Sequence, residues 1–247
     1  MLITAEDRNK WKGFSNEQIR IFKETNCSSH FTPTQLKYIN NKSLTPTQIR
    51  AALEFLTADL TLKQINDGLA LIKNITLDDL FEEKLSMILK AFKSNLTNEE
   101  INLFINDTIE IKQSKQILLG LLNPLVRPYV SIYAISNVPW ESMEQLRFAL
   151  EIQLDPDQIK FMVVSNLKWD QIMQVTSGFM QGLTIEQMKI CVFDTSRPYI
   201  RTFDPDQIKE LENVFLSFLD NKHSPELSPE QVRFYARENL SSTIINR

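Results

Sequence analysis

Two residues have the types and the spacing that could bind a metal ion. Cys27 and His30 are separated by two residues, which is the spacing of half a zinc site. No second pair of ligands follows, and His223 is the only other His in the chain. Because a structural zinc ion takes about four protein ligands, we predict no metal site.

Cysteine catalysis is the other chemistry that these residues could perform. A nucleophilic mechanism needs Cys27 or Cys191 beside a His that a third group orients, and no spacing here favours that arrangement. Cys191 shares a helical face with Met188 and Val192, so we interpret it as a core residue. The five Gly fit neither a dinucleotide fingerprint nor a P-loop. We therefore predict no catalytic residues and no cofactor.

A duplicated Arg-Pro-Tyr motif is the clearest candidate for a binding contact. It occurs at residues 127–129 and 197–199, and both copies interrupt the helical pattern. Arg and Tyr are enriched at the energetic centres of interfaces, and loops often carry function. The alternative is that Pro ends a helix while Tyr packs beneath the loop. The predicted partner-binding residues are Arg127, Tyr129, Arg197, Tyr199 and Arg201.

The elements that position these residues begin with a repeated phrase. Ten times, a Ser, Thr or Asp precedes a Gln, Glu or Asp by three residues, with apolar residues on both sides. This is a capping box with a hydrophobic staple, which starts a helix. The N-cap residues are Ser15, Thr32, Thr45, Thr61, Thr76, Thr97, Asp155, Thr184, Asp204 and Ser228. We favour this interpretation over a ladder of Gln side chains along a binding groove.

The spacing of the phrase predicts an all-α fold. Within each unit the apolar residues recur at steps of three and four, as after Asp204 at Ile208 and Leu211. Pairs of units span about 29 to 31 residues, a period typical of helical repeats. We predict an α-solenoid-like or irregular superhelix of about 13 to 15 short helices. An irregular helical globule is the alternative. Trp11, Trp140 and Trp169 stand near helix starts and are interpreted as staple or core residues.

The middle of the chain departs from the pattern. Residues 118–138 contain no clear capping box, and Pro124, Pro128 and Pro139 punctuate this region. We predict an N-terminal helical-repeat lobe at residues 1–120, a C-terminal lobe at 121–247 and a hinge near 120–140. One continuous domain is the alternative.

Charge and composition limit the partners. The net charge of −4 gives no overall reason to bind nucleic acid or an anionic membrane. Two widely separated Cys suit a reducing compartment. The most apolar window, residues 117–138, contains Pro and Arg, so we expect no membrane span. A cytoplasmic location is predicted.

The last third of the chain resembles a known helical repeat. Residues 182–188 read GLTIEQM, residues 203–208 read FDPDQI, and residues 227–236 read LSPEQVRFYA. These phrases are similar to a short repeat, GLS-x-EQV alternating with FD-xx-QM, of uncharacterised proteins from Firmicutes and their plasmids and phages. The likeness is clearest over residues 180–240. It implies a helical-repeat fold and an origin on a mobile element, and it assigns no catalytic residue.

The function that these observations predict is binding without catalysis. A helical array presents a long surface whose residues are not needed for stability. We predict a protein–protein interaction protein, and the resemblance implies a phage or plasmid factor that binds a host protein, for example one of a defence system. The first alternative is a nucleic-acid-binding superhelix, with Lys and Arg gathered on one face. The second is a small hydrolase or transferase. No oligomeric state is predicted.

Overall fold

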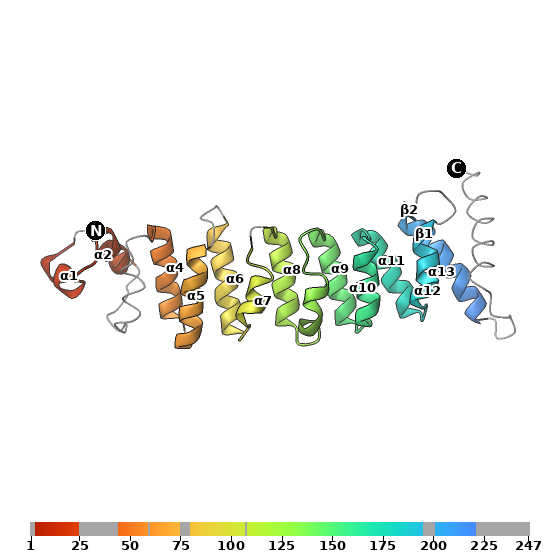
Figure 1. Cartoon of the computed structure of the whole chain (residues 1–247), viewed down its shortest axis with the longest axis horizontal. Helices are drawn as coiled ribbons and strands as arrows, with labels where there is room; N and C mark the ends of the chain where they lie inside the picture. The colour runs from red at the N-terminus through yellow and green to blue at the C-terminus, as the bar shows by residue number, and fades with distance from the viewer. Residues whose placement is uncertain are drawn as a thin grey trace. The chain divides into compact units, whose positions relative to one another are not determined.

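The computed structural model describes residues 3–24, 44–58, 60–74, 80–106, 108–194 and 201–220. Twelve α-helices and one 3-10 helix lie within these ranges, so the all-α prediction is confirmed (Figure 1). The chain divides into two compact units, residues 1–118 and 119–247. Among the predicted capping boxes, those at Thr32, Thr76 and Ser228 lie outside the described residues. The continuous solenoid and the hinge stay predictions.

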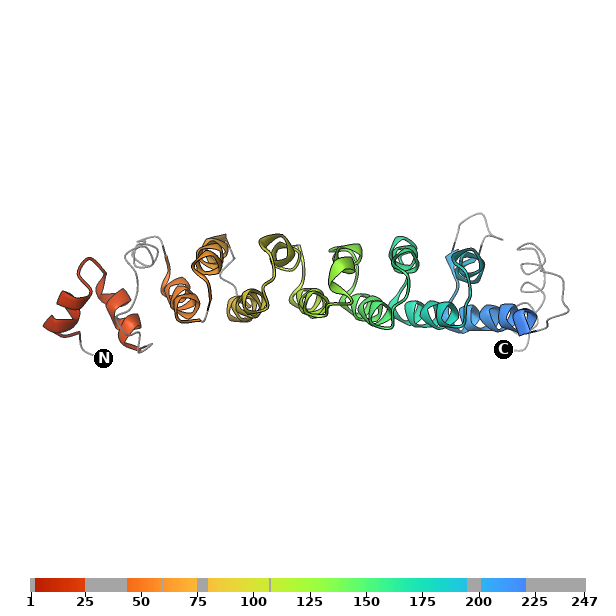
Figure 2. The same ribbon diagram turned by 90° about the horizontal axis from the view of Figure 1, so that it is seen from below.

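The first unit packs each helix against its neighbours along the chain. Helix α4 contacts α2, α5 and α6, and α5 also contacts α6 (Figure 2). The ring of Phe55 on α4 meets that of Phe92 on α6 edge to face at 5.9 Å between centroids. Gly68 on α5 allows this packing, because a Cβ there would lie 2.2 Å from the Phe55 ring. The helices are α1 (Ala5–Lys10), α2 (Asn16–Glu24), α4 (Pro46–Thr57), α5 (Leu62–Asn74), α6 (Phe81–Lys93), α7 (Asn98–Asn102) and, crossing into the second unit, α8 (Ile111–Leu122).

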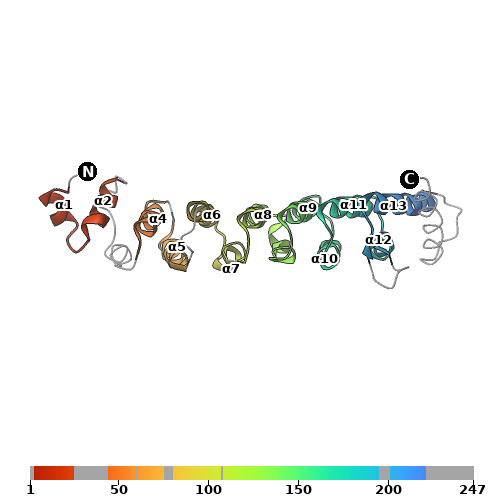
Figure 3. The ribbon, with the colours of Figure 1, turned by 90° about the horizontal axis from the view of Figure 1, so that it is seen from above.

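The second unit arranges its helices in two layers. Helix α11 lies between α9 and α13 in one layer, while η1, α10 and α12 form the other (Figure 3). A ribbon of two short antiparallel strands pairs Phe193 with Thr202 and Asp194 with Arg201. The elements are η1 (Arg127–Ile132), α9 (Trp140–Glu151), α10 (Pro156–Val164), α11 (Trp169–Met180), α12 (Ile185–Val192), β1 (Phe193–Asp194), β2 (Arg201–Thr202) and α13 (Pro205–Asp220).

The predicted capping boxes form wherever the structure describes them. In all seven, the side-chain oxygen at N3 accepts from the N-cap N–H at 2.7 to 3.1 Å. In six, the N-cap side chain accepts in return from the N3 N–H. Asp155 differs, because its carboxylate accepts from the N–H of Asp157, one residue earlier. The helix starts are therefore stabilised as the sequence predicts.

The ends of helices are joined directly to the next start. Asn95 and Gly182 have positive φ of 55° and 90°, as a C′ residue requires. The N–H groups of Leu96 and Leu183, the residues that follow, donate back to the carbonyls of Ala91 and Gly178, which closes a Schellman motif. The same two Leu residues immediately precede the next N-caps, Thr97 and Thr184. One buried Leu thus ends one helix and staples the next.

Several N3 Gln side chains have a second role that the sequence analysis missed. The Gln64 amide donates from Nε2 to the carbonyl of Phe92 in the last turn of α6 at 2.6 Å. Gln48 reaches the carbonyl of Ile72 on α5 at 3.5 Å, and Gln171 reaches that of Phe203 before α13. A Glu at N3 would close the capping box equally well but has no hydrogen to donate. The preference for Gln over Glu is the signal that could have revealed these links between helices.

Replacing Gln64 with Glu tests this second role. The variant keeps the oxygen that accepts from the Thr61 N–H, but its other oxygen would face the Phe92 carbonyl without a proton. We expect the free energy of unfolding to fall by about 1–2 kcal/mol, measured by urea denaturation with circular dichroism. The control is Gln187→Glu on α12, whose described bonds are those of its own box with Thr184. It should change stability by less than about 0.5 kcal/mol. Equal losses in the two variants would contradict the proposed link.

Candidate functional site

The first copy of the Arg-Pro-Tyr motif forms the 3-10 helix η1. Arg127 begins this helix and is half-buried, whereas Tyr129 is 38% exposed. Val130 and Tyr133 from the same segment are fully buried and anchor it. Arg197 and Tyr199 lie outside the described residues, and the backbone of Arg201 lies in β2. The binding of a partner by the two copies of the motif therefore stays a prediction.

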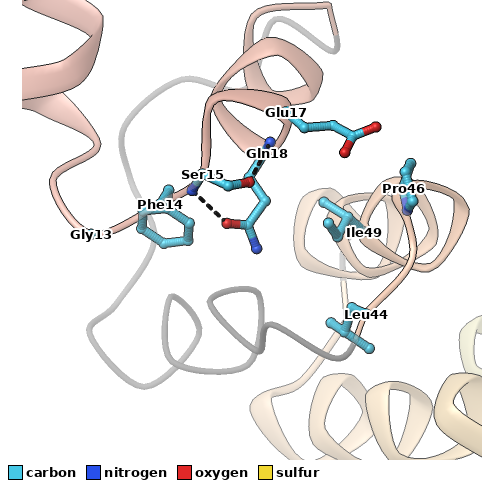
Figure 4. A pocket seen from close by; sticks show the side chains of 8 residues that line it. All are labelled: Gly13, Phe14, Ser15, Glu17, Gln18, Leu44, Pro46 and Ile49. Carbon is cyan, nitrogen blue, oxygen red and sulfur yellow. Dashed lines mark hydrogen bonds between the residues drawn. The ribbon is translucent and has the colours of Figure 1, made fainter.

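A surface hollow of about 360 Å³ lies between the starts of α2 and α4 (Figure 4). Ser15 and Gln18 line it, but their oxygens are engaged in the capping box of α2. Among the described residues that line the hollow, Glu17 is the one with an ionisable side chain. General acid–base chemistry usually needs two such groups that converge. The metal prediction concerns Cys27 and His30, which lie outside the described residues. Within the described ranges, no three His, Cys, Asp or Glu side chains gather as metal ligands.

The most perturbed carboxylate is buried between three helices of the second unit. Glu212 on α13 is 2% exposed, and its Oε1 has no hydrogen-bond partner. A Cβ on Gly178 of α11 would lie 2.7 Å from this oxygen and 2.8 Å from the Sδ of Met188 on α12. Burial raises the pKa of Glu212 to about 7, partly offset by Lys209 one turn earlier. Glu212 therefore gains its charge near neutral pH at a helix interface.

Cys191 lies in the same interface, and its surroundings make its thiol unreactive. It is fully buried beside Met188 and Val192, as predicted. Burial raises the pKa of its thiol, and the Glu212 carboxylate raises it further. A nucleophilic Cys needs the opposite shift, because the thiolate is the reacting species.

An exposed apolar stripe lies on α9 and α11. It consists of Phe148 on α9 and Trp169, Met173 and Met180 on α11, and these side chains are 50%, 48%, 46% and 65% exposed. The three α11 residues fall within about 40° of one another around the helix, because they are four and eleven residues apart. Large apolar side chains gathered at a surface are typical of binding sites. We refer to these four residues as the apolar stripe.

The α11 residues of the stripe lie away from α13. On α11, Gly178 and Gln171 mark the side that faces α13, through the contacts with Glu212 and Phe203. The three α11 residues of the stripe lie on the water-facing side of the helix, on the half of that side that is away from α13. Helices α9 and α11 pack against each other in one layer (Figure 3), and Phe148 and the three α11 residues are exposed side chains of this helix pair.

This stripe is not among the binding sites that the sequence predicts. Trp11 is buried, as predicted, but the core or staple interpretation of Trp169 is wrong. Trp169 follows its N-cap directly, and that position turns outward on α11 while Ile172 and Val175 fill the core. The spacing of Trp169, Met173 and Met180 could have indicated the stripe. These residues form a second apolar face on a helix whose first apolar face fills the core.

The burial of Glu212 predicts a pH-dependent stability. Its folded-state pKa of about 7 lies above its ordinary value of 4.5, so between these pH values the folded chain keeps a proton that the unfolded chain loses. The free energy of unfolding should therefore fall as the pH rises from about 4.5 to about 7 and then level off. Glu212→Gln should remove this part of the dependence. We compare the free energy of unfolding of the variant with that of wild type by urea denaturation. This difference should shift in favour of the variant by about 2–3 kcal/mol between pH 5 and pH 8.

The matched control for this measurement is Glu210→Gln, an exposed position on the same helix. It should retain the wild-type dependence on pH. Parallel stability curves for wild type and Glu212→Gln would contradict the assignment.

Comparisons of the chain with models of known protein families, with curated proteins and with solved structures gave no match. The predicted likeness to a Firmicutes repeat is therefore neither supported nor opposed by a relative. The function proposed below rests on the geometry and the surface chemistry of the chain itself.

Proposed function

We propose that this chain is a non-catalytic protein that binds another protein through the apolar stripe of its second unit. The single observation that carries the proposal is the exposure of Phe148, Trp169, Met173 and Met180 on two neighbouring helices. Trp and Met are enriched where proteins meet, and burying such side chains supplies much of the affinity. Their removal from water would be favourable in a complex.

The stripe is not needed to hold the unit together. Helix α11 already buries Ile172, Val175 and Phe179 against its neighbours. Met173 and Met180 are 46% and 65% exposed and do not belong to this buried core. Exposing large apolar side chains to water is unfavourable. We therefore propose that a partner covers these residues and that this explains their presence on the surface.

The alternatives have weaker support. A nucleic-acid-binding surface gathers Lys and Arg, whereas the surface of α9 carries Glu141 and Glu144. An enzyme brings titratable groups together in an open pocket, but two strongly perturbed groups, Glu212 and Cys191, are buried between helices. A membrane is not proposed as the partner, and within the described ranges every helix is too short or too polar to span one. An origin on a mobile element and a host defence protein as target stay predictions.

Replacing Met173 and Met180 together with Glu tests the proposal. Both positions are exposed on α11, and Glu is a good helix former, so the fold should persist. Affinity purification from the native host with mass spectrometry should recover a specific partner with the wild-type chain. We expect the double variant to lose at least about 90% of that partner, because two charges would replace the buried anchors.

Two further baits make the result specific. Val164→Glu changes an exposed apolar residue on α10, in the other layer, and should leave recovery unchanged. Arg127→Ala with Tyr129→Ala tests the predicted motif contact on η1. Unchanged recovery with the Met173 and Met180 double variant, or loss with the η1 variant alone, would overturn the role of the stripe.

A further inference from the structure

We infer that the partner presents a basic amphipathic helix to the apolar stripe. This inference rests on the proposed function and adds the chemistry of the ligand. Three features of α9, α11 and α13 carry it: the length of the stripe, the charges on these helices and the kinds of apolar side chain in the stripe.

The length of the stripe suits a helical ligand. Trp169 and Met180 are eleven residues apart on α11, or about 16 Å along the helix axis. That distance equals about three turns, so a ligand helix aligned with α11 would place apolar residues from successive turns over Trp169, Met173 and Met180. Phe148 on α9 widens the contact on the side away from α13.

The charges on the helices of this layer favour a basic ligand. Glu141 and Glu144 are partly exposed on α9, and Asp170 is partly exposed on α11. Asp206 and Glu210 are exposed on α13, which packs on the side of α11 away from the stripe. Arg147 on α9 is engaged by Glu151 in a salt bridge. The other basic residues of these helices and their N-caps are Lys168 and Lys209, so acidic groups outnumber basic ones on this layer.

The distribution of charge along the chain agrees with this. Residues 1–118 contain 15 acidic and 15 basic residues, whereas residues 119–247 contain 16 acidic and 12 basic ones. The whole net charge of −4 therefore belongs to the second unit. Lys and Arg on the polar face of a ligand helix would meet a surface of opposite sign.

The Met side chains indicate tolerance for different apolar sequences in the ligand. Met is unbranched and polarizable, so its side chain adapts to partners of different shape. Two of the four stripe residues are Met. Amphipathic pattern and positive charge are thus the features to which we assign recognition, and a fixed ligand sequence is not required.

Two designed peptides of 18 residues test the inference with the full chain. One alternates Leu and Lys in a helical amphipathic pattern, and the other has the same pattern with Glu in place of Lys. Binding of fluorescein-labelled peptide is measured by fluorescence anisotropy. We expect the Lys peptide to bind at least about tenfold more tightly than the Glu peptide, and this preference to shrink as salt rises. A Leu-Lys peptide of scrambled pattern should bind at least tenfold more weakly.

Variants of the chain assign the binding to this surface. Glu141→Lys with Glu144→Lys should reduce the preference for the Lys peptide at least fivefold, and Met173→Glu with Met180→Glu should weaken Leu-rich peptide binding of either charge. The matched control is Glu186→Lys on α12, which changes an exposed acidic residue in the other layer. This control should reduce the preference for the Lys peptide less than the α9 double variant does. Circular dichroism should show the wild-type helix content in every variant.

The possible failures are distinguishable. If both amphipathic peptides bind equally tightly and the Met variant weakens both, the basic character of the ligand is refuted while the proposed binding surface stands. If the Lys peptide binds but Glu186→Lys affects it as much as the α9 double variant, its binding is non-specific attraction to an acidic protein and the inference is overturned. If neither peptide binds, the inference fails, and the affinity purification alone decides the proposed function.

Discussion

The joint between consecutive helices is the constraint on which the rest of this structure depends. At Leu96 and Leu183, one buried side chain closes the Schellman motif of the helix before it and staples the helix after it. Asn95 and Gly182 make the reversal possible by adopting positive φ, and Thr97 and Thr184 immediately satisfy the next set of N–H groups. Because no residue lies between the Leu that ends one helix and the N-cap of the next, the joint fixes the angle between successive helices. Each helix then packs on the neighbours that precede and follow it.

The repeated Gln extends this local device into tertiary structure. Its oxygen serves its own helix start. In Gln64 its nitrogen serves a carbonyl in the last turn of α6, and in Gln171 it serves a carbonyl of the segment leading into α13. A single amide therefore links a local capping bond to a contact about 30 residues away in sequence. This coupling requires both a donor and an acceptor on one side chain, which explains why Gln is preferred where Glu would complement the helix dipole better.

Packing by layers also determines which surfaces are available for binding. In the second unit, α11 is flanked by α9 and α13 and covered on one side by α10 and α12. Its remaining side faces water, and there the chain places Trp169, Met173 and Met180. The reverse occurs inside the unit, where the carboxyl group of Glu212 is buried against Gly178 and Met188. Both features go against ordinary amphipathic patterning, one with apolar residues outside and one with a carboxyl group inside.

The sequence by itself determined the fold class and the positions where helices begin, because capping boxes, staples and C′ residues act within a few residues of each other. It also indicated that Cys191 belongs to the core, since Met188 and Val192 share its face. It did not determine that Trp169 faces outward, because an apolar residue after an N-cap suits either face until α9 and α13 are placed beside α11. Nor did it show the second bond of Gln64 or the raised pKa of Glu212. Those depend on atoms that are distant in sequence, and only the packing of the helices decides which of them meet.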